Sequence, residues 1–303
     1  MTARSHLRQL GDLAWGSGER RAATRRDVVF SLLTRTVPAV AVDSDGMRFY
    51  VETADQAVGR QTFINGSYDL EAMRTALSLI EAQANVSLRG RDFIDVGANI
   101  GTTVVPACKI FGASGALALE PSSRNLTQLR VNVAANGLQD VVKVLPVAVS
   151  NTSGELELEL NAVGNQGDNR LRIGTAKAGA WQEDSWETET VRVITLDEVF
   201  DQVDDPAVLW VDTQGHEAHV LAGATSAAAI PAVIEYWPYG LRRMSGLEQL
   251  HDLLLTRYSR IFDIRSGDAS KGMRPRELTA QSLRDLPLSY PGPGQYTDLV
   301  LIP

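Results

Sequence analysis

The sequence predicts an α/β fold organised around a mostly parallel β-sheet. From residue 93 onward, short apolar runs typical of buried strands alternate with segments of helical character, which is the signature of a parallel sheet with helices between its strands. The first run, 93–96, breaks into a glycine-rich turn, 97–101, and the turn opens a helix. Such a turn brings bare backbone and a helix N-terminus up to a ligand. The second run, 116–119, ends on the carboxylate Glu120.

Composition indicates a globular protein with one large domain. The chain has 303 residues, of which 44% are hydrophobic and 22% charged, and both values are ordinary for such proteins. We expect an N-terminal part, 1–88, with a helical arm, a hairpin and a helix packed on the core. The ligand-binding domain, 89–303, would follow with an insertion at about 151–190. The net charge of −8 argues against nucleic acid as a partner, because phosphate binding uses clustered Lys and Arg.

The sequence also predicts a cytoplasmic protein without integral membrane association. Its single cysteine, Cys108, cannot form an internal disulfide, which is consistent with a reducing compartment. No run of 18 or more apolar residues occurs, and residues 1–26 lack the apolar core of a signal peptide.

The N-terminal part is expected to be helical and then to form a hairpin. Arginines beside apolar residues over 1–40 indicate a helical arm with one wet face, which we interpret as a solvated cap or a homodimer contact rather than an anion or membrane site. Residues 40–52 predict two strands around 43–46, with Gly46 at the position of positive φ. Asp69 is a plausible N-cap for the helix that follows.

The rest of the chain continues the alternation with one interruption. Ser122 or Ser123 can cap a helix that runs to Asn136, and 141–149 predicts the third strand. Residues 151–190 predict an edge hairpin and a long Gly-, Asn- and Thr-rich loop. This loop is either a cover over the acceptor side of the predicted ligand site or a mobile insertion. The later segments predict a short strand that turns into a helix over 191–200, strands at 208–211, 232–240, 261–264 and 297–302, a helix at 247–258, and a helical or irregular stretch at 274–286.

The glycine turn and Glu120 point to a nucleoside-containing cofactor. A carboxylate at the end of the second strand can accept both hydroxyls of a ribose. The dinucleotide fingerprint G-x-G-x-x-G is not met, because Asn99 occupies the second glycine position and no third glycine follows. A less bare turn preceded by Asp95 suits a ligand with an amino acid end and no phosphate, and S-adenosylmethionine (SAM) fits that description.

An ordered set of motifs makes the prediction more specific. DVGANIG is followed by EPSSRNLTQLRVNVAANGL from Glu120, VLPVAVSNTSGELEL from Val144, VRVITLDEV from Val191 and LWVDTQGHEAHVLAGA from Leu209. Over about residues 46–237 the chain resembles the FkbM family of SAM-dependent methyltransferases. The resemblance implies a class I methyltransferase fold, a Rossmann-like and mostly parallel sheet of seven strands with the last antiparallel. It also implies O-methylation of a small hydroxylated acceptor, such as a sugar, a glycolipid or a secondary metabolite.

The predicted cofactor-binding residues lie at the strand ends and in the turn. Ala148, Val149 and Ser150 can frame an adenine ring through their backbone groups, and Asn165 and Gly167 match a short stretch associated with the family. The full predicted set is Asp95, Gly97, Ala98, Asn99, Gly101, Glu120, Pro121, Ala148, Val149, Ser150 and Asp212.

Four residues compete for the role of general base. Asp212, at the end of a strand beside the first one, can instead hold the turn or touch the cofactor, and Glu217 can instead complement the dipole of a helix. His216 has the most convenient pKa but occupies a slot that varies in the family. Glu235, at the end of the next strand, can instead hydrogen-bond the acceptor.

Several alternatives stay open. His216 and His219 do not have zinc-motif spacing, so no metal ligand is assigned, although Mg²⁺ on Asp212 with Glu235 or Glu217 is compatible with oxygen ligands. N- or C-methylation on the same fold, or a non-catalytic SAM-binding regulator or scaffold, are the alternative functions. The indole faces of Trp181, Trp186 and Trp237 are hypothetical stacking surfaces for a sugar.

Overall fold

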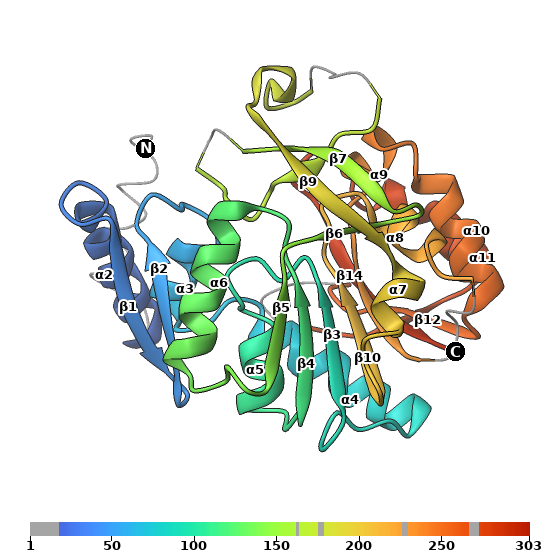
Figure 1. Cartoon of the computed structure of the whole chain (residues 1–303), viewed down its shortest axis with the longest axis horizontal. Coiled ribbons are helices and arrows are strands. Elements are labelled where there is room, and N and C mark those ends of the chain that lie inside the picture. The colour runs from blue at the N-terminus through green and yellow to red at the C-terminus, as the bar shows by residue number, and fades with distance from the viewer. Residues whose placement is uncertain (1–17, 162–163, 175–178, 226–229, 267–272) are drawn as a thin grey trace.

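A central eight-stranded sheet dominates the computed structural model, which describes residues 18–161, 164–174, 179–225, 230–266 and 273–303 (Figure 1). Its strand order is β13-β12-β14-β11-β10-β3-β4-β5. The strands are β3 (Asp92–Val96), β4 (Gly115–Leu119), β5 (Val142–Leu145), β10 (Pro206–Val211), β11 (Ala232–Tyr236), β12 (Arg260–Asp263), β13 (Arg276–Leu278) and β14 (Thr297–Ile302). The strands from β5 to β11 run parallel to their neighbours, and the closing strand β14 is antiparallel to β11, as predicted.

The sheet has one strand more than expected. Part of the segment 274–286, expected to be helical or irregular, forms β13, which pairs antiparallel with β12 at the edge. The short helix α11 (Ala280–Asp285) follows, and it begins with a capping box between Thr279 and Ser282. The edge strand has only three residues, too few to show a two-residue periodicity in the sequence.

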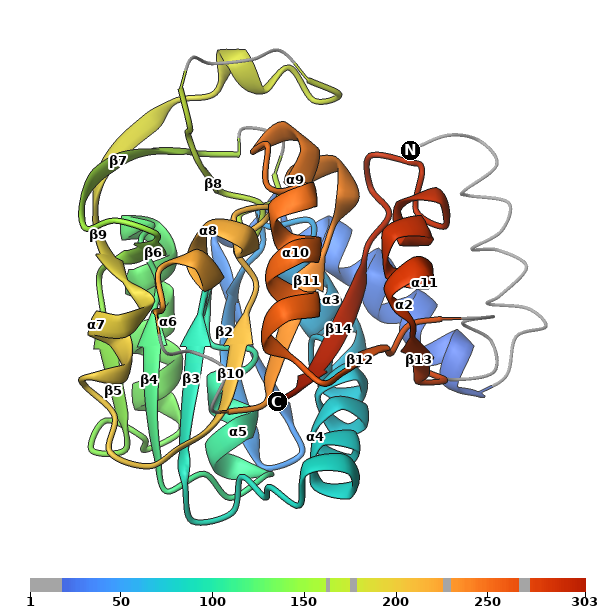
Figure 2. The same ribbon diagram turned by 90° about the vertical axis from the view of Figure 1, so that its right-hand side faces the viewer.

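Helices cover both faces of the sheet, so the molecule has three layers (Figure 2). Successive side chains of a strand point to opposite faces, and in β3 Phe93 belongs to one core cluster while Ile94 belongs to the other. The first cluster includes residues of α4 (Leu70–Ala84), α5 (Val104–Lys109) and α6 (Ser123–Ala135). The second includes residues of α7 (Leu196–Phe200), α8 (Glu217–Ala222), α9 (Pro238–Arg243), α10 (Leu247–Arg257) and α11. Burial of both faces explains why the central strands read as continuous apolar runs.

A second sheet has the order β6-β9-β7-β8. Its strands are β6 (Ala148–Ser150), β7 (Gly154–Glu159), β8 (Arg170–Leu171) and β9 (Thr188–Thr195). The single strand predicted over 141–149 is therefore wrong: β5 belongs to the central sheet and β6 to the second one. Pro146 lies between them, and proline cannot donate to a strand ladder. The predicted edge hairpin is confirmed, because β7 and β8 are consecutive antiparallel strands and β8 lies at the edge of this sheet, while the other side of β7 pairs with β9.

The predicted N-terminal hairpin is confirmed. After α2 (Gly18–Leu33), β1 (Ala39–Ser44) pairs with β2 (Met47–Glu52), and α3 (Val58–Asn65) follows. Asp45 and Gly46 both have positive φ, 51° and 74°, as a two-residue turn of type I′ requires. Residues 1–17 of the predicted arm lie outside the described ranges. Within those ranges, no helix has both the length and the apolar character needed to cross a bilayer.

Asn132 in α6 and Asn136 at its C-terminal cap attach the hairpin to the domain. Asn132 Oδ1 accepts from the Tyr50 N–H at 2.7 Å, and Asn132 Nδ2 donates to the Tyr50 carbonyl at 3.2 Å. Asn136 makes the same pair of bonds with Arg48, at 2.9 Å and 2.7 Å. The hairpin is thus fixed to the helix that follows β4, close to the predicted cofactor site.

The predicted helix caps are not formed by the side chains that the sequence suggested. Asp69 precedes α4 but makes no capping bond, and its carboxylate pairs instead with Arg265 at 3.0 Å. Ser122 precedes α6 without a side-chain cap, while Glu189 accepts from the Ser123 N–H at 3.0 Å. Tertiary partners have replaced the local contacts at both helix starts.

Candidate active site

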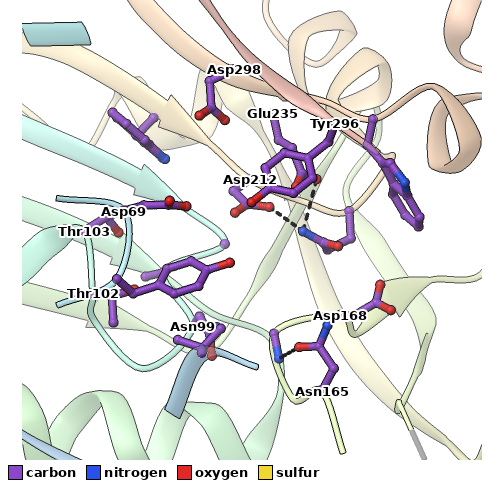
Figure 3. A pocket seen from close by; sticks show the side chains of 18 of the residues that line it. Asp69, Asn99, Thr102, Thr103, Asn165, Asp168, Asp212, Glu235, Tyr296 and Asp298 are labelled. Atoms are coloured by element: carbon purple, nitrogen blue, oxygen red, sulfur yellow. Dashed lines mark hydrogen bonds between the residues drawn. The ribbon is translucent and has the colours of Figure 1, made fainter. Parts of the chain in front are cut away.

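Two adjoining cavities lie where β3, β4, β10 and β11 end. Parallel strands place their carboxyl ends at one edge of a sheet, and ligands bind there. The larger cavity has a volume of about 180 Å³ and the smaller one about 60 Å³. Both are lined by Gly97, Asn99, Gly167, Asp212 and Gln214. Figure 3 shows the larger cavity, with Asp212 and Glu235 close to each other on one side of it.

The glycine turn is held tightly between two strand ends. Gly97 has φ +90°, and a Cβ there would lie 1.9 Å from the carbonyl oxygen of Asp212. The N–H groups of Gly97 and Ala98 donate to the Leu119 carbonyl at 2.9 Å and 3.0 Å. Gly101 also has positive φ, +93°. The turn therefore needs glycine for its conformation and for its close approach to the end of β10.

The smaller cavity contains most of the residues predicted for the nucleoside end of the cofactor. Glu120, Pro121, Ala148 and Val149 line it, together with the apolar side chains of Val96, Leu119, Val147, Leu158 and Leu171. Ser150 does not line it. A largely apolar slot with the carboxylate of Glu120 at its wall suits an adenine ring beside a ribose.

Glu120 is buried and held by backbone groups. Its Oε2 accepts from the Asn99 N–H and its Oε1 from the Ser122 N–H, each at 2.8 Å. A carboxylate has about four lone-pair sites, so both oxygens keep acceptor capacity for hydroxyl groups. Burial raises the pKa of Glu120 to about 7.

Asp95 lies behind the wall of the larger cavity. Its side chain is fully buried and lines neither cavity. Its Oδ2 accepts from the Thr103 hydroxyl, while its Oδ1 has no hydrogen-bond partner in the described part of the chain. Burial raises the pKa of Asp95 to about 7. Thr102 and Thr103, rather than Asp95, present their side chains to the larger cavity.

Of the four candidate bases, Asp212 and Glu235 line the larger cavity. The Gln214 side-chain amide joins them, because its Nε2 donates to Asp212 Oδ1 at 2.7 Å and to Glu235 Oε2 at 3.0 Å (Figure 3). Burial and the negative charge of neighbouring carboxylates raise the pKa of both groups above the usual range. Asp212 also borders the smaller cavity, so it lies where the two meet.

Glu217 and His216 have structural contacts instead. Glu217 Oε1 accepts from the Thr213 N–H at 2.9 Å, the Thr213 hydroxyl at 3.0 Å and the Gly215 N–H at 3.2 Å. His216 Nε2 lies 2.9 Å from Ser150 Oγ, and burial lowers the pKa of His216 to about 3. Neither residue lines a cavity.

The donor set does not support the Mg²⁺ alternative. Across the residues that the structure describes, no three His, Cys, Asp or Glu side chains are grouped so as to hold a metal ion. The two carboxylates of that alternative, Asp212 and Glu235, are instead joined by an amide donor, Gln214 Nε2.

The insertion contributes part of the wall of the larger cavity, and a buried arginine holds that part in place. Arg170 is fully buried, and its guanidinium pairs with Asp168 at 2.6 Å and Glu183 at 2.9 Å. The guanidinium carbon also lies 5.2 Å from the ring centroid of Trp181 and 4.6 Å from that of Trp237, within cation–π range. Arg170 thereby joins β8, the segment around 179–186 and the start of α9.

The hypothesis of indole stacking applies to two of the three tryptophans. Trp181 and Trp237 line the larger cavity, with their ring centroids 6.0 Å apart. Trp186 is 5% exposed and lines neither cavity. Asn165 and Gly167, of the family-associated stretch, both line the larger cavity.

Several residues of the larger cavity were not predicted from the sequence. They are Val58, Tyr68, Asp69, Thr102, Thr103, Asp168, Trp210, Gln214, Pro293, Gly294, Tyr296 and Asp298. Tyr296 and Asp298 had a readable signal: because β14 runs antiparallel to β11, its N-terminal end lies at the edge where the parallel strands end. Polar residues at the start of that strand therefore face the site.

The fold and the position of the cavities define a doubly wound, Rossmann-like α/β protein with its ligand site at the topological switch point between β3 and β10. Residues 95–248, just over half of the chain, match the family model described as the methyltransferase FkbM domain. The chain belongs to the FkbM methyltransferase family, as its motifs predicted, and the expected class I methyltransferase fold is confirmed.

Individual relatives are distant. Over 135 residues, 44% of this chain and 49% of the relative, the chain is 28% identical to the hexuronic acid methyltransferase AglP of Haloferax volcanii. It thus spans about half the length of this curated relative. Among solved structures, a methyltransferase FkbM from Methylobacillus flagellatus KT is 14% identical with a TM-score of 0.41, covering 92% of this chain and 59% of that one. An O-methyltransferase from Bacillus cereus in complex with SAH is 12% identical with a TM-score of 0.42, covering 93% and 100%.

Proposed function

We propose that the protein transfers a methyl group from SAM to a hydroxyl of a small acceptor, either a sugar, a glycolipid or a secondary metabolite. The observation that carries the proposal is the meeting of two cavities of different chemistry at Asp212. One is a narrow, largely apolar slot with the buried carboxylate of Glu120, and the other is wider and lined by both carboxylates and aromatic side chains. A cofactor and an acceptor that must react need such adjoining sites.

Residues of the smaller cavity and the turn would hold the cofactor. Glu120 has free lone pairs for two ribose hydroxyls, and the segment around Ala148 and Val149 provides apolar contact for adenine. The bare turn at Gly97 leaves room for the amino acid end beside Thr103. When bound, SAM supplies a methyl group on a positively charged sulfur.

Asp212 is the best-placed residue to accept the proton of the acceptor hydroxyl. It borders both cavities, and Gln214 orients its carboxylate. Its raised pKa is an advantage, because a general base is most effective when its pKa lies near the working pH. Trp181 and Trp237 provide aromatic faces for a sugar ring. The hexuronic acid named for the Haloferax volcanii relative also favours a sugar acceptor.

Calorimetric titration with SAM and with NAD tests the cofactor. We expect SAM alone to bind, and Glu120→Ala to weaken its binding at least tenfold, roughly the loss of one hydrogen-bonded charge contact. Glu277→Ala, at an exposed position of β13, is the matched control and should bind SAM as the wild type does. Binding of NAD in place of SAM would contradict the proposal.

Transfer from methyl-labelled SAM to a panel of hydroxylated sugars and metabolites then tests the reaction. Mass spectrometry of the product should locate the new methyl group on oxygen. A methyl group on nitrogen or carbon, or SAM binding without transfer to any member of the panel, would reject O-methylation.

A further inference from the structure

The larger cavity is unusually rich in negative charge. Asp69, Asp212, Glu235 and Asp298 all line it, and no Lys, Arg or His is found among its described lining residues. Asp168 lines it too but is paired with the buried Arg170. Figure 3 shows these carboxylates on more than one wall of the cavity.

One cation serves two of the four carboxylates. Arg265, which is not a lining residue, pairs with Asp69 at 3.0 Å and with Asp298 at 2.5 Å. If all four carboxylates are ionised, one guanidinium leaves an excess of three negative charges. Burial raises the pKa of Glu235, and the negative charge of Asp212 raises it further.

Glu235 and Asp298 form a pair on adjacent strands. They are opposite residues in the antiparallel ladder of β11 and β14, so their side chains lie on the same face and next to each other. Glu235 is 8% exposed, and its Oε1 makes no hydrogen bond in the described part of the chain. Glu235 lines the cavity, and a carboxylate oxygen that faces a cavity without a protein donor can accept a hydrogen bond from a donor on the ligand.

We propose that the acceptor carries a protonated amine, which Glu235 and Asp298 bind beside Asp69, as in an amino sugar. This inference rests on the proposed function. SAM carries two positive charges and one negative charge, so its net charge offsets only one of the negative charges that these carboxylates carry when they are ionised. An ammonium group on the acceptor supplies a further counter-charge, whereas an anionic acceptor would meet like charges in a partly desolvated site.

The aromatic residues of the cavity fit the same class of acceptor. Tyr68, Tyr296 and Trp237 line its walls. Aromatic faces attract cations and also pack on the apolar face of a sugar. Glu235 and Asp298 lie away from the smaller cavity, which is proposed to hold the nucleoside end of the cofactor, since neither residue lines it.

A charge series of sugars tests the proposal. The full chain, saturated with S-adenosylhomocysteine so that no turnover occurs, would be titrated calorimetrically with glucosamine, 6-amino-6-deoxyglucose, glucose and glucuronate. We expect at least one amino sugar to bind at least tenfold more tightly than glucose, and glucuronate to bind more weakly than glucose. Equal affinities across the series, preference for glucuronate, or binding of none of the four would overturn it.

Variants separate acceptor recognition from cofactor binding. In Asp298→Asn, and in the double variant Glu235→Gln/Asp298→Asn, we expect the preference for the amino sugar over glucose to fall at least tenfold, with S-adenosylhomocysteine affinity within threefold of wild type. Thermal unfolding and S-adenosylhomocysteine binding confirm that each variant is folded. Loss of S-adenosylhomocysteine binding in a folded variant would assign the carboxylates to the cofactor and overturn this inference. Failure of the wild type to bind S-adenosylhomocysteine would instead reject the proposed function itself.

Discussion

His216 Nε2 lies 2.9 Å from Ser150 Oγ, so the imidazole binds a strand of the second sheet. It is fully buried and stacks on His219, with ring centroids 4.5 Å apart. A histidine in these surroundings positions the start of α8 and has no access to an acceptor.

We therefore expect His216→Gln to lower stability and to spare chemistry. The loss of a buried hydrogen bond should lower the free energy of unfolding by about 1–3 kcal/mol. Single-turnover methyl transfer should change less than tenfold, whereas loss of a general base costs about 10²–10⁴-fold. Urea unfolding and rapid-quench kinetics would measure both, and a hundredfold loss of rate in a folded variant would restore His216 as the base.

Asp212→Asn should remove most of the activity while SAM still binds. A general base acts in its deprotonated form, and the pKa of Asp212 is raised by burial. The wild-type rate should therefore increase as the pH rises through the neutral and mildly alkaline range. The variant should lose about 10²–10⁴-fold in rate and lose this dependence.

Glu217→Gln, at the same turn, is the comparison for Asp212→Asn. Its Oε1 holds Thr213 and Gly215, so a change there should affect the unfolding transition more than the pH profile. If Asp212→Asn kept the wild-type pH profile, another group would be the base.

Asp95→Asn should alter the pH dependence of stability. The folded-state pKa of Asp95 is about 7, against about 3.9 in an unfolded chain. The folded protein thus binds this proton more tightly than the unfolded chain does. The stability that the bound proton contributes is complete below about pH 4 and is lost as the pH rises towards 7. The loss is about 4 kcal/mol at most, at 1.36 kcal/mol per pKa unit.

The asparagine variant lacks this titration, and it keeps an oxygen to accept from Thr103. Without ligand, it should gain stability relative to wild type between pH 5 and pH 8, as urea unfolding at the two pH values would show. Parallel pH dependences of the two proteins would contradict the prediction. If Asp95 also serves the cofactor, the same variant should bind SAM more weakly.

Gly97→Ala should abolish SAM binding, because a Cβ would lie 1.9 Å from the Asp212 carbonyl oxygen. Either the turn or the end of β10 must move to relieve that contact. Gly137→Ala is a matched control, since Gly137 also has positive φ, +67°, but nothing lies within 4 Å of the added Cβ. The control should cost only about 1 kcal/mol of stability and leave the calorimetric affinity for SAM unchanged. Equal effects of the two substitutions on SAM affinity would show that the positive φ, and not the close contact with Asp212, is the cause.

Arg170→Met should loosen the insertion. The substitution leaves Asp168 and Glu183 without their buried cation. In comparable buried pairs, removing one partner lowers the free energy of unfolding by about 3–5 kcal/mol. Limited proteolysis should then cleave near 179–186 faster than in the wild type. Arg48→Met, which breaks the exposed pair with Asp43, is the control and should leave both stability and cleavage unchanged. Unchanged proteolysis of Arg170→Met would show that other contacts hold the segment.

The sequence predicted the features that local patterns encode. The strand predicted at 93–96, the positive φ of Gly46 and the antiparallel closing strand all follow from short apolar runs, turn residues and motif order. The clustering of Gly97 and Glu120 at the two cavities was readable for the same reason, since they lie within 24 residues of one another in a single motif region.

The far walls of the larger cavity depend on contacts between distant segments. Asp69 and Asp298 meet at Arg265, and Asp69 alone looks like a helix cap. Arg170 reads as an ordinary polar residue of a loop, and its burial between tryptophans of separate segments has no local signature. The division of 141–150 between two sheets depended on a single proline whose consequence is visible only when both sheets are known.

The hydrogen bonds of Asn132 and Asn136 with the hairpin have a consequence for association between molecules. A β-strand whose outer backbone groups are free can pair with a strand of another chain and begin aggregation. Here, the amide side chains of Asn132 and Asn136 occupy the N–H and carbonyl groups of Tyr50 and Arg48. They take the place of a neighbouring strand, so this edge of the hairpin is closed to intermolecular pairing.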